Sequence, residues 1–230
     1  MINELSIIVL AKNEHDNLVE ILPKLKPICN DLIVIDGHSN DKTNNLCKIL
    51  NISFFLDDGR GKGSAQRLGS QKAKNKYLIF FDGDGAPDIN DIEKIYELLK
   101  VNDLIICSRQ TGGSYDLNFS KGFSSAIRAS GCIILTSLFN KLFNTRFTDI
   151  LYSFKGVDKK IFDSLNTKSN GFTIEIDILI NAVLKEHKIL EIPSRENARK
   201  YGKSKLPTIT GIYFIYYIIY KYFYNKIFKI

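Results

Sequence analysis

The sequence has few cysteines, and their spacing fits neither of the structures that cysteines usually build. Four cysteines occur among 230 residues, and no two of them form a C-x-x-C pair. A zinc site or a disulfide framework requires closely or regularly spaced cysteines, so this distribution argues against both and is typical of the reducing cytosol. A basic-then-apolar leader is also lacking, because an apolar strand pattern already begins at Leu5. We therefore expect no secretion signal.

Long apolar segments, internal repeats and low-complexity linkers are lacking as well. The uncharged run from Thr208 to Tyr220 has thirteen residues, fewer than the about 20 that an α-helix needs to span a bilayer. The composition, with 44% hydrophobic and 25% charged residues, is ordinary for a folded domain and not for a disordered chain. A length of 230 residues suits one α/β domain with a short appendage.

The net charge of +7 is concentrated at the carboxyl end. From Arg195 onward, eight basic residues stand against a single acid, Glu196, whereas the preceding residues carry 24 basic and 24 acidic side chains. A basic end on a neutral domain favours a polyanionic partner such as phosphate, an anionic lipid surface or a nucleic acid. A merely solvated basic end is the alternative.

Short apolar runs alternate with helical patterns through the first half of the chain. The run 77–81 is apolar at every position, which suits a strand covered on both faces of a sheet. The alternation favours right-handed crossovers and therefore an α/β, Rossmann-like fold with a mostly parallel central sheet flanked by helices. The predicted strands are 5–10, 31–35, 52–55, 77–81 and 103–108, and the predicted helices are 15–25, 41–50, 62–73 and 89–100.

The pattern changes after Ser108 and becomes more helical. A helical pattern covers 123–143, a short strand fits 153–157, another helix fits 173–185, and a last strand fits 189–192. Because no linker separates this half from the first, we interpret it as an extension of the same domain.

Two carboxylates follow the buried strand of the first half. Asp82 and Asp84 lie in a turn that also contains Gly83 and Gly85. In open α/β sheets, ligands bind at the carboxyl ends of the strands. The pair could hold a hard divalent cation whose other ligands are diphosphate oxygens and water, and such a cation offsets the charge on a diphosphate leaving group. A solvated or helix-capping pair is the alternative.

Two other turns are suited to a nucleotide. Asp36 at a strand end could accept hydrogen bonds from a base or ribose, while Gly37 allows a ligand to approach the backbone closely. The alternative is that Asp36 and Asp41 only organise the turn and cap the next helix. Residues 60–63 (R-G-K-G) open a helix, where backbone N–H groups and Lys62 favour an anion. The spacing of a P-loop is lacking there.

In this order, the turns resemble those of the family 2 glycosyltransferases of the GT-A fold, and among them the dolichyl- or polyprenyl-phosphate sugar synthases. The resemblance covers residues 4 to 207. Its seven segments are the strand and Asn-Glu signature at 7–14, the nucleotide-binding turn at 35–43, the segment 60–65, the D-x-D at 82–84, the arginine after the fifth strand at 108–109, the stretch 148–155, and the R-x-x-G-x-S-K-L segment at 199–206.

Several positions depart from the family pattern. Residues 10–12 (L-A-K) stand where many relatives have Pro-Thr-Tyr, so a tyrosine that stacks near the nucleotide is lost. Gly37 occupies a place often held by a second Asp, and Ala86 a place often held by Gln. Ser153 and Lys155 replace the usual Gly and Arg. These changes concern the identity of the donor more than the class of reaction.

The resemblance implies a donor site and a catalytic centre. Its donor is a nucleotide-sugar such as GDP-mannose or UDP-glucose, with Asp36 and Glu14 at the nucleoside and Mg²⁺ or Mn²⁺ held by Asp82 and Asp84 against the diphosphate. The nucleotide-sugar-binding residues that it implies are Leu10, Lys12, Glu14, Asp36, Lys62, Asp82, Gly83, Asp84, Arg109, Arg199 and Lys205, the last two closing over the phosphates. The catalytic residues are Asp82, Asp84, Arg109, Arg128 and Asp149.

The acceptor decides how the reaction is catalysed. A polyprenyl (dolichyl) phosphate is already ionised at neutral pH, so an inverting attack on the anomeric carbon would need positioning and charge neutralisation rather than a strong base. Arg109 and Arg128 could hold such a phosphate. A sugar hydroxyl, as in polysaccharide or glycoconjugate synthesis, would need a carboxylate base. Asp149 is then the candidate, and a structural cap is the alternative role for it.

The carboxyl-terminal residues 208–230 predict an amphipathic helix beyond a catalytic domain of residues 1–207. The four polar residues Lys221, Asn225, Lys226 and Lys229 fall within about 140° of a helical wheel. An aromatic-rich helix with a lysine face fits the headgroup region of a membrane. We expect a peripheral protein on the cytoplasmic face of a membrane, with a core or dimer-contact helix as the alternative.

Two other classes of function fit parts of the sequence, but less well than a glycosyltransferase does. A nucleotidyltransferase would show a glycine-rich basic signature after the first strand, whereas residues 11–14 (A-K-N-E) contain no glycine. A nucleic-acid-binding module would account for the basic end and would bind with a steep salt dependence. Here the basic residues adjoin an aromatic, lipid-like run, so we expect no nucleic acid partner.

Overall fold

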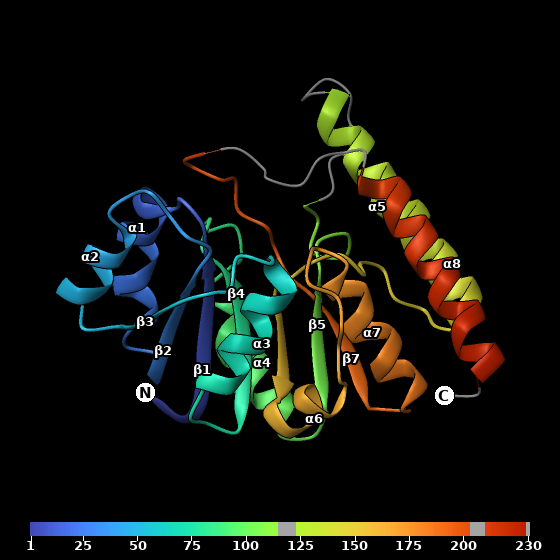
Figure 1. Cartoon of the computed structure of the whole chain (residues 1–230), viewed down its shortest axis with the longest axis horizontal. Helices are drawn as coiled ribbons and strands as arrows, with labels where there is room; N and C mark the ends of the chain where they lie inside the picture. Colours follow the sequence, from blue (N-terminus) through green and yellow to red (C-terminus); the bar gives the residue numbers. More distant parts are fainter. Residues whose placement is uncertain (115–122, 203–209, 229–230) are drawn as a thin grey trace.

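Seven strands form the central sheet of the computed structural model, which describes residues 1–114, 123–202 and 210–228 (Figure 1). Their order across the sheet is β3-β2-β1-β4-β6-β5-β7. All neighbours pair in parallel except β6, which is antiparallel to β4 and β5. The predicted mostly parallel sheet is confirmed. The strands are β1 (Ile2–Ala11), β2 (Cys29–Asp36), β3 (Ser53–Leu56), β4 (Tyr77–Asp82), β5 (Leu104–Ser108), β6 (Lys155–Asp158) and β7 (Ile189–Pro193).

The sheet is buried on both faces because successive side chains of its central strands enter two different cores. In β4, Ile79 and Phe81 belong to one core, whereas Leu78 and Phe80 belong to the other, and all four are at most 1% exposed. Neighbouring side chains of a strand point to opposite faces. A strand that is apolar at every position therefore requires a covering layer on each side, as the sequence predicted.

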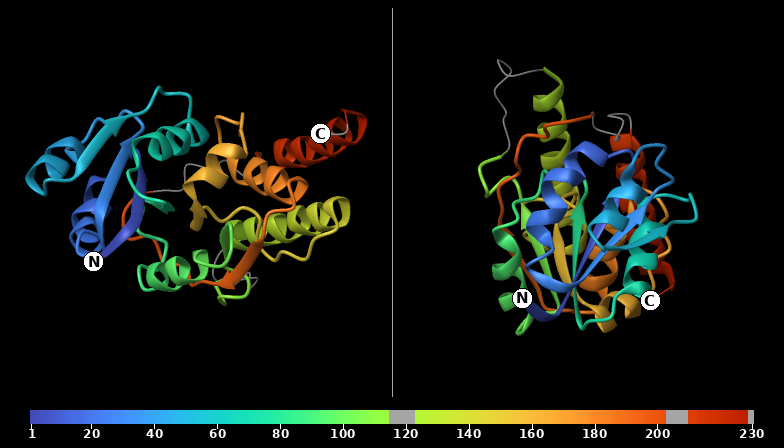
Figure 2. Two further views of the ribbon diagram at one scale, coloured as in Figure 1. Left: turned by 90° about the horizontal axis from the view of Figure 1, so that it is seen from below. Right: turned by 90° about the vertical axis from the view of Figure 1, so that its left-hand side faces the viewer.

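Helices supply those two layers (Figure 2). One core receives side chains from α1, α2 and α4, and the other from α3, α5, α6, α7 and α8. In α4, Ile92, Ile95 and Leu99 recur at helical spacing and are buried. The helices are α1 (His15–Leu25), α2 (Thr43–Ile49), α3 (Lys62–Lys72), α4 (Asp91–Leu99), α5 (Phe123–Phe143), α6 (Lys159–Ser164), α7 (Ile174–Leu184) and α8 (Thr210–Phe228).

The predicted elements agree with the observed ones to within three residues at each end. The sequence did not predict α6. Its six residues are too few to show a periodic pattern, and it begins where Asp158 accepts a hydrogen bond from the backbone N–H of Lys160 at 2.8 Å. The first strand is longer than expected because Ile2 pairs with Cys29 across an irregularity in the ladder.

The carboxyl-terminal helix α8 lies along α5, at the side of the domain away from α1 and α2 (Figure 1). Its inner face contributes Phe214 and Ile218 to the core, with exposures of 2% and 0%. Lys221 was expected on an exposed lysine face, but its Nζ lies 2.7 Å from Asp177 Oδ1 of α7 and its side chain is 18% exposed. The helix therefore turns this lysine inward. Within the described ranges, no helix is both long and apolar enough to cross a membrane.

Candidate functional site

The carboxyl ends of four neighbouring parallel strands surround a cavity of about 440 Å³. Lys12 follows β1, Gly37 follows β2, Asp57 follows β3, and residues 82–84 end β4. Ligand sites in open α/β sheets form at this edge because the loops that leave adjacent strands converge there. The cavity is therefore where the fold itself predicts a ligand.

The first two turns are tied together by Asn13 and Ser39. The backbone N–H of Asn13 donates to Ser39 Oγ at 2.7 Å, and Asn13 Oδ1 accepts from the backbone N–H of Asn40 at 2.8 Å. Asp36 holds the second turn, since its Oδ2 accepts from the backbone N–H of Ser39 at 2.8 Å and its Oδ1 accepts from Ser39 Oγ at 2.5 Å. Asp36 is 1% exposed and does not line the cavity. Its described contacts thus organise the turn, and a contact with the nucleoside stays a prediction.

Glycine is required at two places where backbones meet at the cavity. The N–H of Gly83 donates to the carbonyl of Leu10 at 2.9 Å, and a Cβ at Gly83 would lie 3.0 Å from that oxygen. Gly61 has a φ of +117°, and a Cβ there would lie 2.9 Å from the carbonyl oxygen of Asn170. Any other residue would have to push the neighbouring turn away. The two glycines therefore fix how closely these turns pack around the cavity.

Asp82 and Asp84, the predicted metal ligands, both line the cavity and each lies beside a cation. Lys62 Nζ is 2.9 Å from Asp82 Oδ1 and 3.1 Å from its Oδ2, and Arg199 pairs with Asp84. Burial raises the pKa of Asp82, but the charge of Lys62 outweighs it, so the net pKa lies below the ordinary value. Burial and then the charge of Asp82 raise the pKa of Asp84.

These residues fit a divalent cation. Two carboxylates supply the oxygen ligands that Mg²⁺ and Mn²⁺ prefer, and diphosphate and water would complete the coordination. A cation would relieve the repulsion that raises the pKa of Asp84. Among the residues that the structure describes, no group of three or more His, Cys, Asp or Glu side chains gathers to hold a metal by itself. Asp82 and Asp84 would therefore share the ion with the ligand.

Residues 194–201 cross the top of the sheet from β7 to α1 and close one side of the cavity (Figure 1). The segment is held by a bridge between Glu196 and Pro87 and by a hydrogen bond of 2.7 Å from Asn197 N–H to the carbonyl of Ala86. The crossing segment brings Glu196 and Arg199 to the cavity wall. Arg199 thus reaches a residue 115 positions earlier, Asp84.

Arg109 forms an ion pair with the buried Asp149 at the edge of the cavity. Arg109 Nε lies 2.7 Å and its Nη2 3.1 Å from the two oxygens of Asp149, which is 1% exposed. The guanidinium also lies 4.8 Å from the ring of Tyr152 and 3.6 Å from Glu196 Oε1. Burial raises the pKa of Asp149, but Arg109 outweighs it and the net pKa is lowered. Asp149 therefore stays ionised and bonded, and only Arg109 of this pair lines the cavity.

The predicted site residues that the structure describes fall into three groups. Nine line the cavity: Leu10, Lys12, Glu14, Lys62, Asp82, Gly83, Asp84, Arg109 and Arg199. Asp36 and Asp149 are buried beside it, and Arg128 is an exposed residue of α5 that does not line it. Arg128 lies four positions before Cys132, whose sulfur donates to Asp149 Oδ1 at 3.3 Å, so both residues share one face of α5. Lys205 lies outside the described residues.

Sequence reasoning missed several residues of the cavity wall. Asp57 follows β3 directly, and its place at a strand end is a signal that could have found it. Tyr152, Phe172 and Glu196 come from loops that only the folded chain brings together. The hydroxyl of Tyr152 is buried without a hydrogen-bond partner among the described residues, which leaves a donor for a ligand to satisfy. Burial raises the pKa of Glu196.

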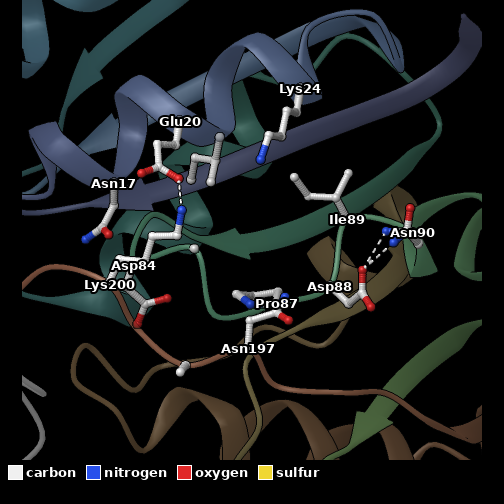
Figure 3. A pocket seen from close by; sticks show the side chains of 13 residues that line it. Asn17, Glu20, Lys24, Asp84, Pro87, Asp88, Ile89, Asn90, Asn197 and Lys200 are labelled. Carbon is white, nitrogen blue, oxygen red and sulfur yellow. Dashed lines mark hydrogen bonds and ion pairs between the residues drawn. The ribbon is translucent and has the colours of Figure 1, made fainter.

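A second cavity of about 680 Å³ lies on the other side of the Asp84 turn (Figure 3). Its walls are α1 and the crossing segment, which are joined by an ion pair of 2.5 Å between Glu20 and Lys200. Among the described residues, the two cavities share Asp84. Nine of the predicted site residues line the first cavity, and Asp84 alone of these nine also lines the second, so the second cavity is not the expected donor site.

Comparisons with known proteins agree with this arrangement. Residues 6–165 match the family model of glycosyl transferase family 2. The chain is 25% identical over 75% of its length to the glycosyltransferase AglJ of Haloferax volcanii and 26% identical over 71% to the dolichyl-phosphate beta-glucosyltransferase of Saccharomyces cerevisiae. It covers 55% of each of these two proteins. The chain thus spans about half the length of the curated relatives it matches.

Solved structures show the same fold. The glucosyl-3-phosphoglycerate synthase of Mycobacterium tuberculosis, in a complex with Mn²⁺, UDP-glucose and phosphoglyceric acid, superposes with a TM-score of 0.72 at 15% identity, covering 95% of this chain and 79% of that one. A complex of the same enzyme with Mg²⁺ and UDP gives a TM-score of 0.70. The fold is therefore the Rossmann-like GT-A fold. Because the family model covers most of the chain, this protein belongs to glycosyltransferase family 2.

Proposed function

We propose that this glycosyltransferase moves a hexose from a nucleotide-diphospho-sugar to a polyprenyl (dolichyl) phosphate, with inversion at the anomeric carbon. The observation that carries the proposal is the cavity at the carboxyl ends of β1 to β4. Asp82 pairs there with Lys62 and Asp84 with Arg199, and Arg109 lines the same cavity. Acidic residues for a cation and basic residues for phosphates converge there. The sugar and the acceptor are proposed from the relatives, three of which are dolichyl-phosphate beta-glucosyltransferases.

The donor would lie with its diphosphate at the Asp82 and Asp84 turn. Lys62 and Arg199, which pair with these carboxylates, would then contact phosphate oxygens. Mg²⁺ or Mn²⁺, when bound, would neutralise charge on the departing diphosphate. UDP-glucose is favoured over GDP-mannose because the named relatives are glucosyltransferases and the solved complexes contain UDP.

The state of Asp149 supports an acceptor that is already ionised. Both its oxygens are bonded to Arg109, its pKa is lowered, and its side chain has no exposed surface. A carboxylate in this state is a poor proton acceptor for a sugar hydroxyl. Arg109 reaches the cavity and could bind an acceptor phosphate while Asp149 fixes its orientation. A phosphate acceptor needs no base, so the arrangement suits a lipid phosphate.

Organic extraction tests the acceptor. We expect that radiolabel from UDP-glucose, or from GDP-mannose, moves into a chloroform-soluble, mild-acid-labile product when the protein is incubated with membranes and Mn²⁺. Adding purified polyprenyl phosphate should raise the yield of this product, whereas the free alcohol should not, because it lacks the ionised oxygen. Label found only in water-soluble glycan would contradict a lipid phosphate acceptor.

Glu196 favours a second candidate function, transfer to a sugar hydroxyl. It lines the cavity, its side chain is 35% exposed, and burial raises its pKa above the ordinary carboxyl value. Those are the properties of a general base. If label appears in glycan, Glu196→Gln should then abolish transfer, and Asp149, the base expected from sequence, should act only through Arg109.

We propose further that the outer face of α8 attaches the protein to a membrane surface, on the cytoplasmic side. The exposed side chains of this face are almost all tyrosine, phenylalanine or isoleucine: Ile212, Tyr213, Ile215, Tyr216, Ile219, Tyr220, Phe223, Tyr224 and Ile227. Contiguous apolar surface of this kind marks an interaction site, and tyrosine prefers the interface between water and lipid. The aromatic face, not Lys221, whose side chain is only 18% exposed, would therefore contact lipid.

Substitution of the outer face tests the attachment without disturbing the core. The double variant Tyr216→Ser with Phe223→Ser changes side chains that are 63% and 53% exposed, so its stability should be unchanged. We expect it to lose most of its binding to anionic liposomes in a flotation assay, because each exposed aromatic contributes up to about 1.5–3 kcal/mol on burial. The control is Ile49→Ser on α2, which is 81% exposed. Equal flotation of both variants would contradict the membrane role.

A further inference from the structure

A buried carboxylate outside the cavity wall contacts the lysine that faces the diphosphate position. Glu175 lies in the first turn of α7 and is 2% exposed. Its Oε1 lies 3.4 Å from Lys62 Nζ and accepts a hydrogen bond of 3.0 Å from Gln66 Nε2. Its Oε2 pairs with Lys155. A charge this deep in a domain persists only when it is paired.

Lys62 thus has a carboxylate on each side of its ammonium group. Asp82 contacts it from the cavity and Glu175 from the core. The ammonium group of Lys62 therefore pairs with two carboxylates at once, and the side chain of Lys62 is only 14% exposed.

Lys155 balances the second carboxylate. It lies on β6, is 1% exposed, and contacts Oε2 of Glu175, whereas Lys62 lies nearest Oε1. The same segment presents Ser153, whose Oγ donates to Asp82 Oδ2. One stretch of chain, residues 153–155, therefore supports both carboxylates that hold Lys62. Neither Lys155 nor Glu175 lines the cavity, so neither would touch the donor.

We propose that Glu175, neutralised by Lys155, is a positioning residue that keeps the ammonium group of Lys62 directed at the donor diphosphate. The inference rests on the proposed donor site. When a cation and diphosphate bind at the Asp82 turn, Asp82 coordinates the cation and no longer pairs with Lys62. The lysine side chain has four rotatable bonds, so without another partner it could turn away from the diphosphate. Glu175 is a fixed second anchor that the ligand does not displace. Lys62 then contacts the phosphates without a further loss of side-chain freedom.

Nucleotide binding tests the role of Glu175. We expect Glu175→Gln, measured by isothermal titration with UDP and with GDP in the presence of MnCl₂, to weaken binding about tenfold, as loss of a charge-assisted contact does. Glu175→Gln should have no further effect in a Lys62→Met background, because it acts through Lys62. An equal loss in both backgrounds would overturn the positioning role. Glu97→Gln, at an exposed pair with Lys100, is the control.

A charge-balanced variant separates an effect of Glu175 on stability from its effect on nucleotide binding. Glu175→Gln alone leaves Lys155 buried and unpaired, so it should be less stable. The double variant Glu175→Gln with Lys155→Met removes both charges and should recover stability in chemical denaturation, yet still bind nucleotide weakly. Wild-type affinity in the double variant would overturn the inference. If wild-type protein binds neither UDP nor GDP, the proposed donor site itself fails, and the inference fails with it.

Discussion

Asp82→Asn and Asp84→Asn should each lower the rate of sugar transfer by on the order of a hundredfold or more, because a metal ion contributes several kcal/mol of charge stabilisation to a leaving diphosphate. Both carboxylates line the cavity, and neither is part of the apolar core. Asparagine keeps their shape, so the fold should persist. Alanine at either position removes the metal ligand altogether and should abolish transfer.

Metal removal should have the same effect as these substitutions. Wild-type protein in EDTA should lose transfer and recover it when Mn²⁺ or Mg²⁺ is added in excess. Asp88→Asn is a matched control from the same turn, since its carboxylate accepts from the N–H of Asn90 and lines the second cavity. Full activity in EDTA, or of either asparagine variant, would remove the metal from the mechanism.

Arg109→Met should lower the free energy of unfolding by about 3–5 kcal/mol, the cost of leaving the buried carboxylate of Asp149 without its ionic partner. The pair is bidentate, and the side chain of Asp149 has no exposed surface. Asp149→Asn should cost less, because Arg109 is 20% exposed and keeps its contact with Glu196. The outcome is measured by denaturant unfolding. A loss under about 1 kcal/mol for Arg109→Met would show that the pair contributes no more than a solvent-exposed ion pair does.

The same pair predicts a pH dependence of stability. The folded-state pKa of Asp149 is lowered relative to the unfolded chain, so the unfolded state binds a proton at higher pH than the native state does. The stabilisation is therefore complete above the unfolded pKa and is lost as the pH falls through the folded one. Asp149→Asn should show a flatter loss of stability in acid than the wild type. Parallel curves would contradict this assignment.

Local patterns of sequence were sufficient to predict the strands, a mostly parallel sheet and nine of the residues that line the cavity. Strands such as β4 are apolar throughout because both of their faces are covered, and an acid directly after such a strand lies at the ligand-binding edge. Lys62 and Arg109 could be placed in the same way, from their positions at the start of a helix and the end of a strand. For these residues, the flanking sequence alone indicates both the position in the fold and the kind of ligand that the side chain would bind.

The remaining residues depend on contacts between distant segments. Glu196 reaches the cavity only because the crossing segment bridges to Pro87, and Glu175 reaches Lys62 only because α7 packs beside α3. No spacing within the sequence encodes either contact. The helical wheel of α8 also placed Lys221 on the exposed face, because the pattern shows which residues are polar but not that Asp177 lies within ion-pair distance of this lysine. Periodicity assigns a charged residue to the solvent side of a helix even when its partner is buried in the domain.

Diffraction from crystals grown with MnCl₂ and UDP tests the central claim most directly. We expect one anomalous manganese peak within coordination distance of the Asp82 and Asp84 carboxylates, with diphosphate oxygens and water as its other ligands. Lys62 and Arg199 should contact the phosphates. UDP bound in the second cavity, or manganese bound away from both carboxylates, would contradict it.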